Sequence, residues 1–550
     1  MVVAGSILTP SANAESFQSQ NQLEQKKAEV ISQIQQQPIP NSFKSSSFAA
    51  KDVSVTADYK NQINMYETHE YFFTTGGGRF TVKDFQPENQ DIDFVIYNYQ
   101  TDQEAEPSAE GGYDLQPGAY DFTVLSTSDK LTDYEYTLDG SFSEEPDTTL
   151  PAVRVDYLPQ HVLALPKSTN PVFQIKGSSS ADYLTFSTYT SDQELSMDSQ
   201  GYFGTQLNLQ RGDNHFSMYA LKEGGNAVLA NYSVYLAGLT RISGKNRYEV
   251  SSNISKELTS RGSISSGTVI IARGDVFSDA LSGGPLATAE DSPILLTETQ
   301  SLPQTVKDEI KSSGADRAII LGGTGSVSLN VESELRSLGI TAIERVAGKD
   351  RYAVAAQTAE RVAKLQDSDT VIIASGLVFP DALSASSIAG PQGMPILLVN
   401  PSSVPEDIKT FLKNHAEIKH FIVVGGSATV NDTVISQVKS ITAGAAVERI
   451  SGSDRYQVSI NTAEYGIAHY GMDVRTLAFA RGDLFPDALS GAPLANLYSA
   501  PILLTKTDAL ESKVQAFLKK YEYFPQHIYI WGGTGSISSY EEQQLNEKIN

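Results

Sequence analysis

The sequence predicts a multidomain protein in which two all-β sandwiches are followed by three α/β modules with parallel sheets. Two observations predict this. Residues 50–238 alternate polar and apolar side chains with a period of two, as antiparallel strands do. Residues 240–550 repeat one block of sequence at a spacing of 104 residues, as RISGKNRY from Arg241, RVAGKDRY from Arg345 and RISGSDRY from Arg449. That period suits a small α/β module, so function is to be sought in what three copies do together.

Composition excludes several classes of function. The charge of −24 is uneven, since residues 1–240 hold 13 Lys and Arg against 31 Asp and Glu, and residues 241–550 hold 28 against 34. The acidic first part argues against nucleic acid or an anionic membrane as its partner, because both need a basic surface. The chain has no cysteine, which excludes disulfides, thiolate zinc sites and cysteine nucleophiles.

The first 48 residues read as a targeting segment and a linker. Residues 1–14 have an apolar run, then Pro10 and the small residues around Ala12 and Ala14, as at the end of a secretory signal, but the first cation is only Lys26. We expect a truncated signal peptide cleaved after Ala14, with an ordinary flexible terminus as the alternative. Residues 15–48 are rich in Gln and Ser and predict a short helix and a linker.

The β-rich part is expected to form one sandwich at residues 50–148 and an immunoglobulin-like sandwich at residues 150–238. The string DIDFVIYNY from Asp91, followed by LQPGAYDFTVLS, resembles the pre-peptidase C-terminal type of β-domain found beside secreted enzymes. Asp91 and Asp93 are weak candidates for calcium ligands, because carboxylate oxygens suit that ion; exposed turn aspartates are the alternative. Neither sandwich shows a catalytic group, which favours spacer or adhesion roles.

Each repeat alternates apolar strands with amphipathic helices. In the first copy SGTVIIA, PILLT, RAIILGG and TAIERVAG predict strands, and the segments between them predict helices, two of which end at Gly314 and Gly339. Such a pattern indicates a parallel sheet covered on both faces. Ligands of open parallel sheets bind at the carboxyl ends of the strands, so the loops there are the candidate sites.

Three loop types carry polar residues at the same place in every copy. An aspartate in a DALS motif, expected to cap the following helix or to accept a salt bridge, stands at Asp279, Asp381 and Asp487. A glycine pair that suits either a tight turn or an anion stands at Gly322-Gly323, Gly425-Gly426 and Gly532-Gly533. An Arg-Tyr pair opens a helix at Arg247-Tyr248, Arg351-Tyr352 and Arg455-Tyr456. Its cation opposes the helix dipole, so we expect a salt bridge to the DALS aspartate or a neighbouring module, or an anionic ligand.

A catalytic set does not recur. His415, His420, His469 and His527 have no counterparts in the other copies, and Ser282, Ser384 and Ser490 recur without a base. Asp275 with Asp279, and Asp483 with Asp487, suit a metal by spacing, but the middle copy has Leu377 at the first position. We therefore expect no enzyme activity and no resident cofactor beyond the possible calcium.

The GxxRY, DALS, PILL and Gly-Gly motifs, in one order in three copies, resemble the cell-wall-binding repeat 2 family of clostridial cell-surface proteins and bacillar wall amidases. The resemblance implies Toprim-like modules at 240–343, 344–447 and 448–550, associated in a pseudo-threefold arrangement. It also implies that an anionic wall polymer retains the protein non-covalently. The Arg-Tyr pairs, the Gly pairs, the PILL region, Arg273 and Arg481 are then the candidate polymer contacts. The middle copy departs at Ser375, Leu377 and Ser427-Ala428, which puts its site in doubt, and the third copy has Ser453 where the others carry Lys245 and Lys349.

We therefore expect a secreted protein at the cell wall or cell surface, anchored non-covalently to a teichoic-acid-like or polysaccharide polymer, without nucleic acid or a membrane span. The β-domains would serve as spacer, adhesion or regulatory modules. Two alternatives stay open: a metal-dependent phosphoester or wall hydrolase using Asp279 and Asp487, and a modifier of a separate wall hydrolase.

Overall fold

The computed structural model describes residues 53–84, 91–109, 111–128, 131–158, 160–261, 267–522, 524 and 526–549. The expected signal segment at residues 1–14 and the expected helix and linker at residues 15–48 lie outside the described residues. The chain divides into two units. The β-rich unit runs as far as Val234, except for residues 164–169 and 210–213, which belong with the α/β unit that continues from Tyr235. Within the described residues, no helix has both the length and the apolar character needed to cross a bilayer.

The β-rich unit is built from strands β1 to β16. The first block holds β1 (Val53–Ile63), β2 (Glu67–Thr75), β3 (Gly78–Asp84), β4 (Ile92–Asn98), β5 (Gln103–Glu104), β6 (Tyr113–Leu115), β7 (Gly118–Ser126) and β8 (Thr132–Phe142). The second holds β9 (Val153–Val155), β10 (Val162–Leu165), β11 (Val172–Ser179), β12 (Tyr183–Thr188), β13 (Ser191–Glu194), β14 (Tyr202–Asn208), β15 (Gly212–Leu221) and β16 (Ala227–Leu236). The sheets run β1-β8-β3-β6, β13-β12-β15-β16-β2-β7-β4-β5 and β14-β11-β9, and β10 pairs with β16.

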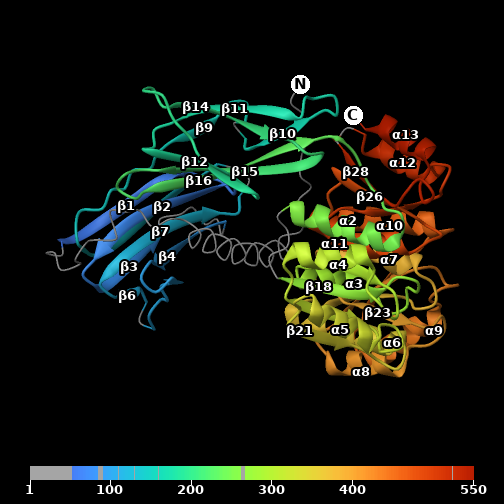
Figure 1. Ribbon diagram of the computed structural model, residues 1–550. Helices are drawn as coiled ribbons and strands as arrows, with labels where there is room; N and C mark the ends of the chain where they lie inside the picture. The colour runs from blue at the N-terminus through green and yellow to red at the C-terminus, as the bar shows by residue number, and fades with distance from the viewer. Residues whose placement is uncertain are drawn as a thin grey trace. The chain divides into compact units, whose positions relative to one another are not determined.

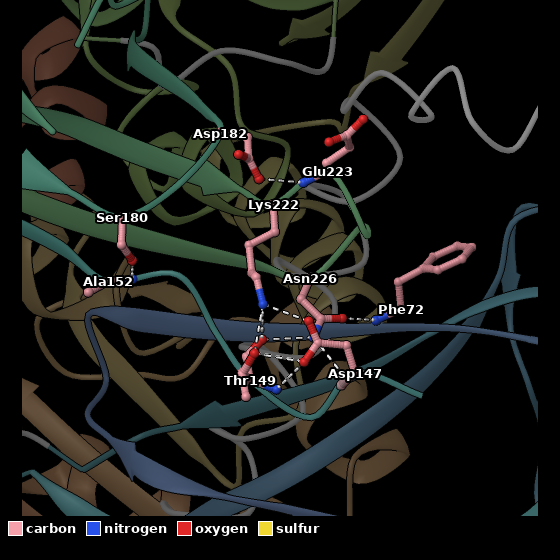
Figure 2. A network of polar contacts seen from close by, with 9 residues as sticks. All are labelled: Phe72, Asp147, Thr149, Ala152, Ser180, Asp182, Lys222, Glu223 and Asn226. Carbon is pink, nitrogen blue, oxygen red and sulfur yellow. Dashed lines mark hydrogen bonds and ion pairs between the residues drawn. The ribbon is translucent and has the colours of Figure 1, made fainter. Parts of the chain in front are cut away.

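The two predicted sandwiches share a sheet, because β16 of the second block pairs antiparallel with β2 of the first, with Ala227 opposite Glu70. Figure 2 shows how the segment between the blocks is held. The Asn226 amide donates to the carbonyl oxygens of Asp147 (2.8 Å) and Thr149 (2.9 Å) and accepts from the Phe72 N–H (2.9 Å). Alternation predicts strands but not which edge meets which, so this continuity was not visible in the sequence.

The α/β unit begins with β17 (Gly238–Ile242) and then contains three runs of helices and strands. The first has α2 (Arg247–Ser260), β18 (Thr268–Arg273), α3 (Gly283–Ala289), β19 (Ile294–Thr297), α4 (Gln304–Ser313), β20 (Arg317–Leu321), α5 (Leu329–Ser337) and β21 (Ala342–Val346). The second has α6 (Arg351–Leu365), β22 (Thr370–Ser375), α7 (Pro380–Ala389), β23 (Ile396–Val399), α8 (Glu406–Asn414), β24 (His420–Val424), α9 (Asp432–Ile441) and β25 (Ala446–Ile450). The third has α10 (Arg455–Tyr470), β26 (Thr476–Arg481), α11 (Pro486–Leu497), β27 (Ile502–Thr505), α12 (Ser512–Lys520), β28 (His527–Trp531) and α13 (Ser539–Lys548).

Each run forms a parallel sheet with helices on both faces, as the sequence predicted (Figure 1). Successive residues of β18 enter different cores. Ile271 packs with Val306 of α4 and Val331 of α5, whereas Ile270 faces a core that draws residues from all three copies. The expected helix stop at Gly314 is confirmed, since this residue ends α4 in the left-handed conformation.

The sheets do not follow the boundaries of the sequence repeats. They run β19-β18-β20-β21, β23-β22-β24-β25 and β27-β26-β28-β17. The strand that holds Arg345 and opens the second sequence copy therefore completes the first sheet. The third sheet is completed by β17, which opens the first sequence copy and places Ile242 opposite Trp531. A sequence period predicts the length of a module but not where one folded module ends. The pairing of β17 with β28, which joins the start of the first copy to the third sheet and which we call the cyclic closure, is therefore seen only in the structure.

Candidate functional site

The loops at the carboxyl ends of the strands meet between the copies. Phe277, Phe379 and Phe485, each two residues before a DALS aspartate, form a cluster whose ring centroids lie 5.5–5.8 Å apart. We call these residues the phenylalanine triad. The sequence analysis gave them no role, although an aromatic residue stands at this place in all three copies.

The arginines of the Arg-Tyr pairs surround this triad, and we call them the arginine triad. Each guanidinium carbon lies over the phenylalanine of a different copy: Arg247 over Phe485 (5.9 Å), Arg351 over Phe277 (5.6 Å) and Arg455 over Phe379 (5.9 Å). The contacts are cyclic, copy one to three, two to one and three to two. An arginine over an aromatic face is a favourable cation–π contact, so it helps to hold the copies together.

The expected salt bridge between these arginines and the DALS aspartates is not formed. Each guanidinium instead donates to the carbonyl oxygen of a glycine in its own copy, Gly274, Gly376 or Gly482, at 2.6–2.7 Å. The described residues include no carboxylate that pairs with any of the three. The preceding residue caps the helix, since the Asn246 and Asp350 side chains accept from two backbone N–H groups each and Asp454 from one. Asn or Asp directly before a helix is a standard capping signal that the sequence analysis passed over.

The prediction that the DALS aspartates cap helices is wrong. The residue before α7 is Phe379 and that before α11 is Phe485, with proline as the first helical residue and no side-chain cap. The buried carboxylates accept instead from hydroxyls of the glycine turn: Asp279 from Ser326, Asp381 from Thr429 (3.1 Å) and Asp487 from Ser536 (2.8 Å). Asp381 and Asp487 follow that proline inside the first helical turn, beyond the capping position, so their carboxylates turn toward the donors of the next loop.

Burial sets the protonation behaviour of two of these groups. It raises the pKa of Asp381, against the hydrogen bond from Thr429 and the nearby Arg455. It likewise raises the pKa of Asp487, against the hydrogen bond from Ser536 and the charges of Arg247 and Arg481. In both cases an arginine of the triad from another copy acts on the aspartate, so the two groups share one electrostatic environment.

The first glycine of each pair is required by this arrangement. Gly322, Gly425 and Gly532 have φ of +108°, +124° and +101°, and an added Cβ would lie 2.2–2.6 Å from the carboxylate oxygen of the aspartate in the same copy. The second glycines, Gly323, Gly426 and Gly533, are half-buried at the turn surface. The need for a tight turn thus explains the first glycine of each pair. A contact between the second glycine and an anion stays a prediction.

Arg273 and Arg481 do not present free cations. Arg273 pairs with Asp275 through two hydrogen bonds, and Arg481 pairs with Asp483 in the same way. The middle copy has Ser375 and Leu377 at these two positions. Its departure is therefore the loss of a whole ion pair, which leaves no unpaired charge behind. Leu377 is instead exposed at 51%.

A third set of arginines was missed, although it opens every repeat. Arg241, Arg345 and Arg449 each donate to the carbonyl oxygen of a first glycine, at Gly532, Gly322 and Gly425. Each also forms an ion pair with an acid in the first turn of the helix that follows that glycine. The acids are Glu542, Glu332 and Asp432, respectively. These arginines brace the glycine turns. Their recurrence at the same place in all three copies could have identified them from the sequence.

The remaining predicted positions lie elsewhere. The PILL leucines, such as Leu295 and Leu296, are fully buried strand residues, so they belong to the core and offer no polymer contact. The rings of Tyr248, Tyr352 and Tyr456 pack on the glycines that the arginine triad contacts. The Asp93 carboxylate accepts from the Phe94 N–H, and Asp91 lies directly before β4. In the parts of the chain that the structure describes, no three His, Asp or Glu side chains gather as a metal site would require, so calcium there stays a prediction.

Comparison with known proteins places these repeats in a family. The family described as cell wall binding domain 2 (CWB2) matches residues 241–332, 345–435 and 449–542, together just over half of the chain. The fold is similar to that of Cwp6 from Clostridium difficile, with a TM-score of 0.54 and 22% identity over 73% of this chain and 68% of that one.

Two curated relatives come from Bacillus subtilis (strain 168). The N-acetylmuramoyl-L-alanine amidase LytC is 31% identical over 310 residues, 56% of this chain and 58% of the amidase. The amidase enhancer is 29% identical over 365 residues, 66% of this chain and 46% of the enhancer. The chain thus spans about half the length of the curated relatives it matches. Its repeats give it a place at the cell wall or cell surface, and the chain belongs to the family of proteins that carry cell wall binding domain 2, with three copies.

Proposed function

We propose that the three repeats retain this protein at the wall by binding an anionic wall polymer, either teichoic-acid-like or a polysaccharide, at the arginine triad. The observation that carries the proposal is the position of Arg247, Arg351 and Arg455. They come from three different copies, surround one phenylalanine cluster and have no carboxylate partner in the described residues. Three cations around one aromatic cluster form a site that no single copy contains.

The chemistry of the triad suits phosphate or carboxylate groups. A guanidinium has five N–H donors, and the described contacts use one in each arginine. The others are available for the paired hydrogen bonds that anions accept. Neighbouring charged units of a long polymer would then reach the second glycines and the tyrosines at the same edge. Several weak contacts on one body add through avidity.

The experiment is a sedimentation assay with purified cell walls and the full chain. Replacing Arg247, Arg351 and Arg455 with glutamine should remove most of the retention, and added salt should weaken that of the unmodified chain. A matched control replaces Arg273 and Arg481, which are already paired with Asp275 and Asp483, and should retain most binding. Thermal melting of each variant separates binding from folding. Equal retention of the triple variant, or full binding to walls stripped of anionic polymer, would refute the proposal.

The finer features of the chain are part of the same proposal. We take the modules to be Toprim-like and the cyclic contacts to form a pseudo-threefold arrangement, with the β-rich unit as a secreted spacer or adhesion region. A binding role without catalysis is favoured because Asp279 and Asp487 each accept from a hydroxyl of their own copy, and Asp275 and Asp483 are each paired with arginine. The aspartates whose spacing suited a metal thus already have partners within the protein.

A second candidate is a modifier of a separate wall amidase. The similarity to the amidase enhancer covers 365 residues, more than the 310 residues between Arg241 and the end of the chain. It therefore extends beyond the repeats. Adding the chain to an amidase digesting purified walls tests this candidate: a faster release of wall fragments supports it, and an unchanged rate with wall-bound chain contradicts it.

A further inference from the structure

The three-stranded sheet β14-β11-β9 of the β-rich unit leaves one face open. Burial alternates along β14, where Phe203 and Leu207 point inward. On the outer face the register aligns Tyr202 with Ser178 and Arg154, Gly204 with Lys176, and Gln206 with Gln174. We call this surface the β14 face. Strand spacings of about 4.8 Å and steps of about 3.3 Å per residue give it a width of roughly 10 Å and a length of roughly 20 Å.

Tyr202 is an exposed aromatic residue on an ordered backbone. Its side chain is 57% exposed. The Asp198 carboxylate accepts from the backbone N–H groups of Gln200 (2.9 Å) and Tyr202 (3.0 Å), and the turn passes through Gly201 at φ +82°. An added Cβ at Gly201 would lie 2.2 Å from the Ser179 carbonyl oxygen, so the turn has little room to change. The backbone that carries Tyr202 is thus fixed before any ligand arrives, which lowers the entropy that binding costs.

The surroundings of Tyr202 are flat and polar. Next to it on β14, an added Cβ at Gly204 would have no neighbour nearer than 3.8 Å, so the space above this glycine is open. Gln206 and Gln174 lie side by side with their amides 3.4 Å apart. At the far edge, β9 is fixed at its start, because the Ala152 N–H donates to the Ser180 hydroxyl at 2.8 Å (Figure 2).

The face also carries the unpaired cations of an acidic unit. Residues 1–240 have a net charge of −18. The other described cations of the β-rich unit each pair with a carboxylate, namely Lys60, Arg79, Lys83 and Lys222. Arg154 and Lys176 form no ion pair with any described residue, and both are exposed on the β14 face. Two free cations on one face of an otherwise acidic unit point to an anionic ligand.

We propose that the β14 face binds an anionic glycan, which gives the β-rich unit a wall contact separate from the repeats. The apolar C–H side of a sugar ring stacks on the exposed Tyr202 ring, and the open space above Gly204 admits the next ring. The glutamine amides donate to and accept from sugar hydroxyls. Arg154 and Lys176 meet carboxylates on the chain. A protein partner is less suited, because the face lacks the apolar cluster on which protein interfaces depend.

The test uses the full chain and soluble peptidoglycan glycan strands freed of secondary wall polymers, with binding measured by calorimetry. Tyr202→Ala should weaken binding about tenfold, Tyr202→Phe should bind nearly as well as the unmodified chain, and Arg154→Gln with Lys176→Gln should remove the salt dependence. The matched control is Tyr183→Ala on β12, because Tyr183 is 52% exposed but lies in another sheet; its binding should be unchanged.

The outcomes separate this proposal from that for the repeats. The arginine-triad variant should lose most of its retention on whole walls yet bind the isolated glycan strands as tightly as the unmodified chain. Absence of strand binding by the unmodified chain, or equal losses for Tyr202→Ala and Tyr183→Ala with unchanged melting curves, would overturn the glycan proposal and leave that for the repeats intact.

Discussion

Glu541 of the third copy occupies a place that is apolar in the other two. The equivalent residues are Val331 and Val434, and all three side chains are fully buried in the helix after the glycine turn. One carboxylate oxygen of Glu541 accepts from the Thr505 hydroxyl, and the other has no hydrogen-bond partner among the described residues. Burial raises the pKa of Glu541 from 4.5 to about 7.

This shift makes the third module less stable as pH rises. A carboxyl whose pKa is higher in the folded state holds its proton longer there than in the unfolded chain, so the free energy of unfolding falls between pH 4.5 and 7. A shift of 2.5 units corresponds to about 3 kcal/mol. Glu541→Val should therefore raise the free energy of unfolding by about 3 kcal/mol at pH 8 and by much less at pH 4. Glu541→Gln is the matched control that keeps an acceptor for Thr505 without a charge.

The assay is urea unfolding followed by tryptophan fluorescence. Trp531 is the single tryptophan of the chain and is fully buried at the end of β28, in the same module as Glu541. The unmodified chain should lose stability from pH 4.5 to 7, and both variants should show a flatter profile. If the valine variant is no more stable at pH 8, or if the glutamine variant keeps the slope of the unmodified chain, Glu541 is not the group responsible.

Two further predictions concern the closure of the repeats. Gly532→Ala should destabilise the third module by about 2 kcal/mol or more, because φ is +101° and the new Cβ would lie 2.2 Å from the Asp487 carboxylate; Gly535→Ala, with open space around it, should change the urea midpoint little. Arg241→Met should lower the free energy of unfolding reported by Trp531 by about 3 kcal/mol, since Arg241 ties β17 to Gly532 and Glu542. Arg345→Met, which removes the same brace from the first module, should leave the Trp531 transition nearly unchanged, and equal effects of the two would disprove the cyclic closure.

The sequence predicted the secondary structure of the repeats because each element is signalled locally. Buried parallel strands such as Thr268–Arg273 are unbroken apolar runs, and Gly314 ends its helix as a left-handed residue must. Pairings between distant segments carry no such local signal. Nothing in the residues of β17 distinguishes pairing with β28 from pairing with a nearer strand, and the same holds for β2 with β16.

The site was predicted in its residues but not in its contacts. Arg247, Arg351 and Arg455 were singled out because a cation at a helix start needs a partner, and the expected partner was the DALS aspartate, a neighbouring module or an anionic ligand. The partner is an aromatic ring of another copy, which alignment within one copy does not reveal. The aspartates were predicted to be caps or salt-bridge partners because they stand beside a helix start, but Asp381 and Asp487 already lie inside the first helical turn, beyond the capping position.

The three copies carry different residues at equivalent positions where their helices α3, α7 and α11 contact one another. Gly284, Ser386 and Ala492 hold equivalent positions on α3, α7 and α11, and a Cβ at Gly284 would lie 2.9 Å from the Ser386 hydroxyl and 3.1 Å from the Ala492 methyl. About one turn farther along, the Asn496 amide reaches the Thr288 hydroxyl at 2.7 Å through the space that Gly390 leaves empty.

Three asparagines at that level would collide, and three glycines would leave a void. Each copy is therefore shaped for its own place in the cycle, and the loss of the Arg–Asp pair from the middle copy belongs to the same specialisation. A polymer bound at the proposed site would therefore meet Ser375 and Leu377 in the middle copy where the other two copies present an Arg–Asp pair, so the three sides of the site are not equivalent although the triad itself repeats.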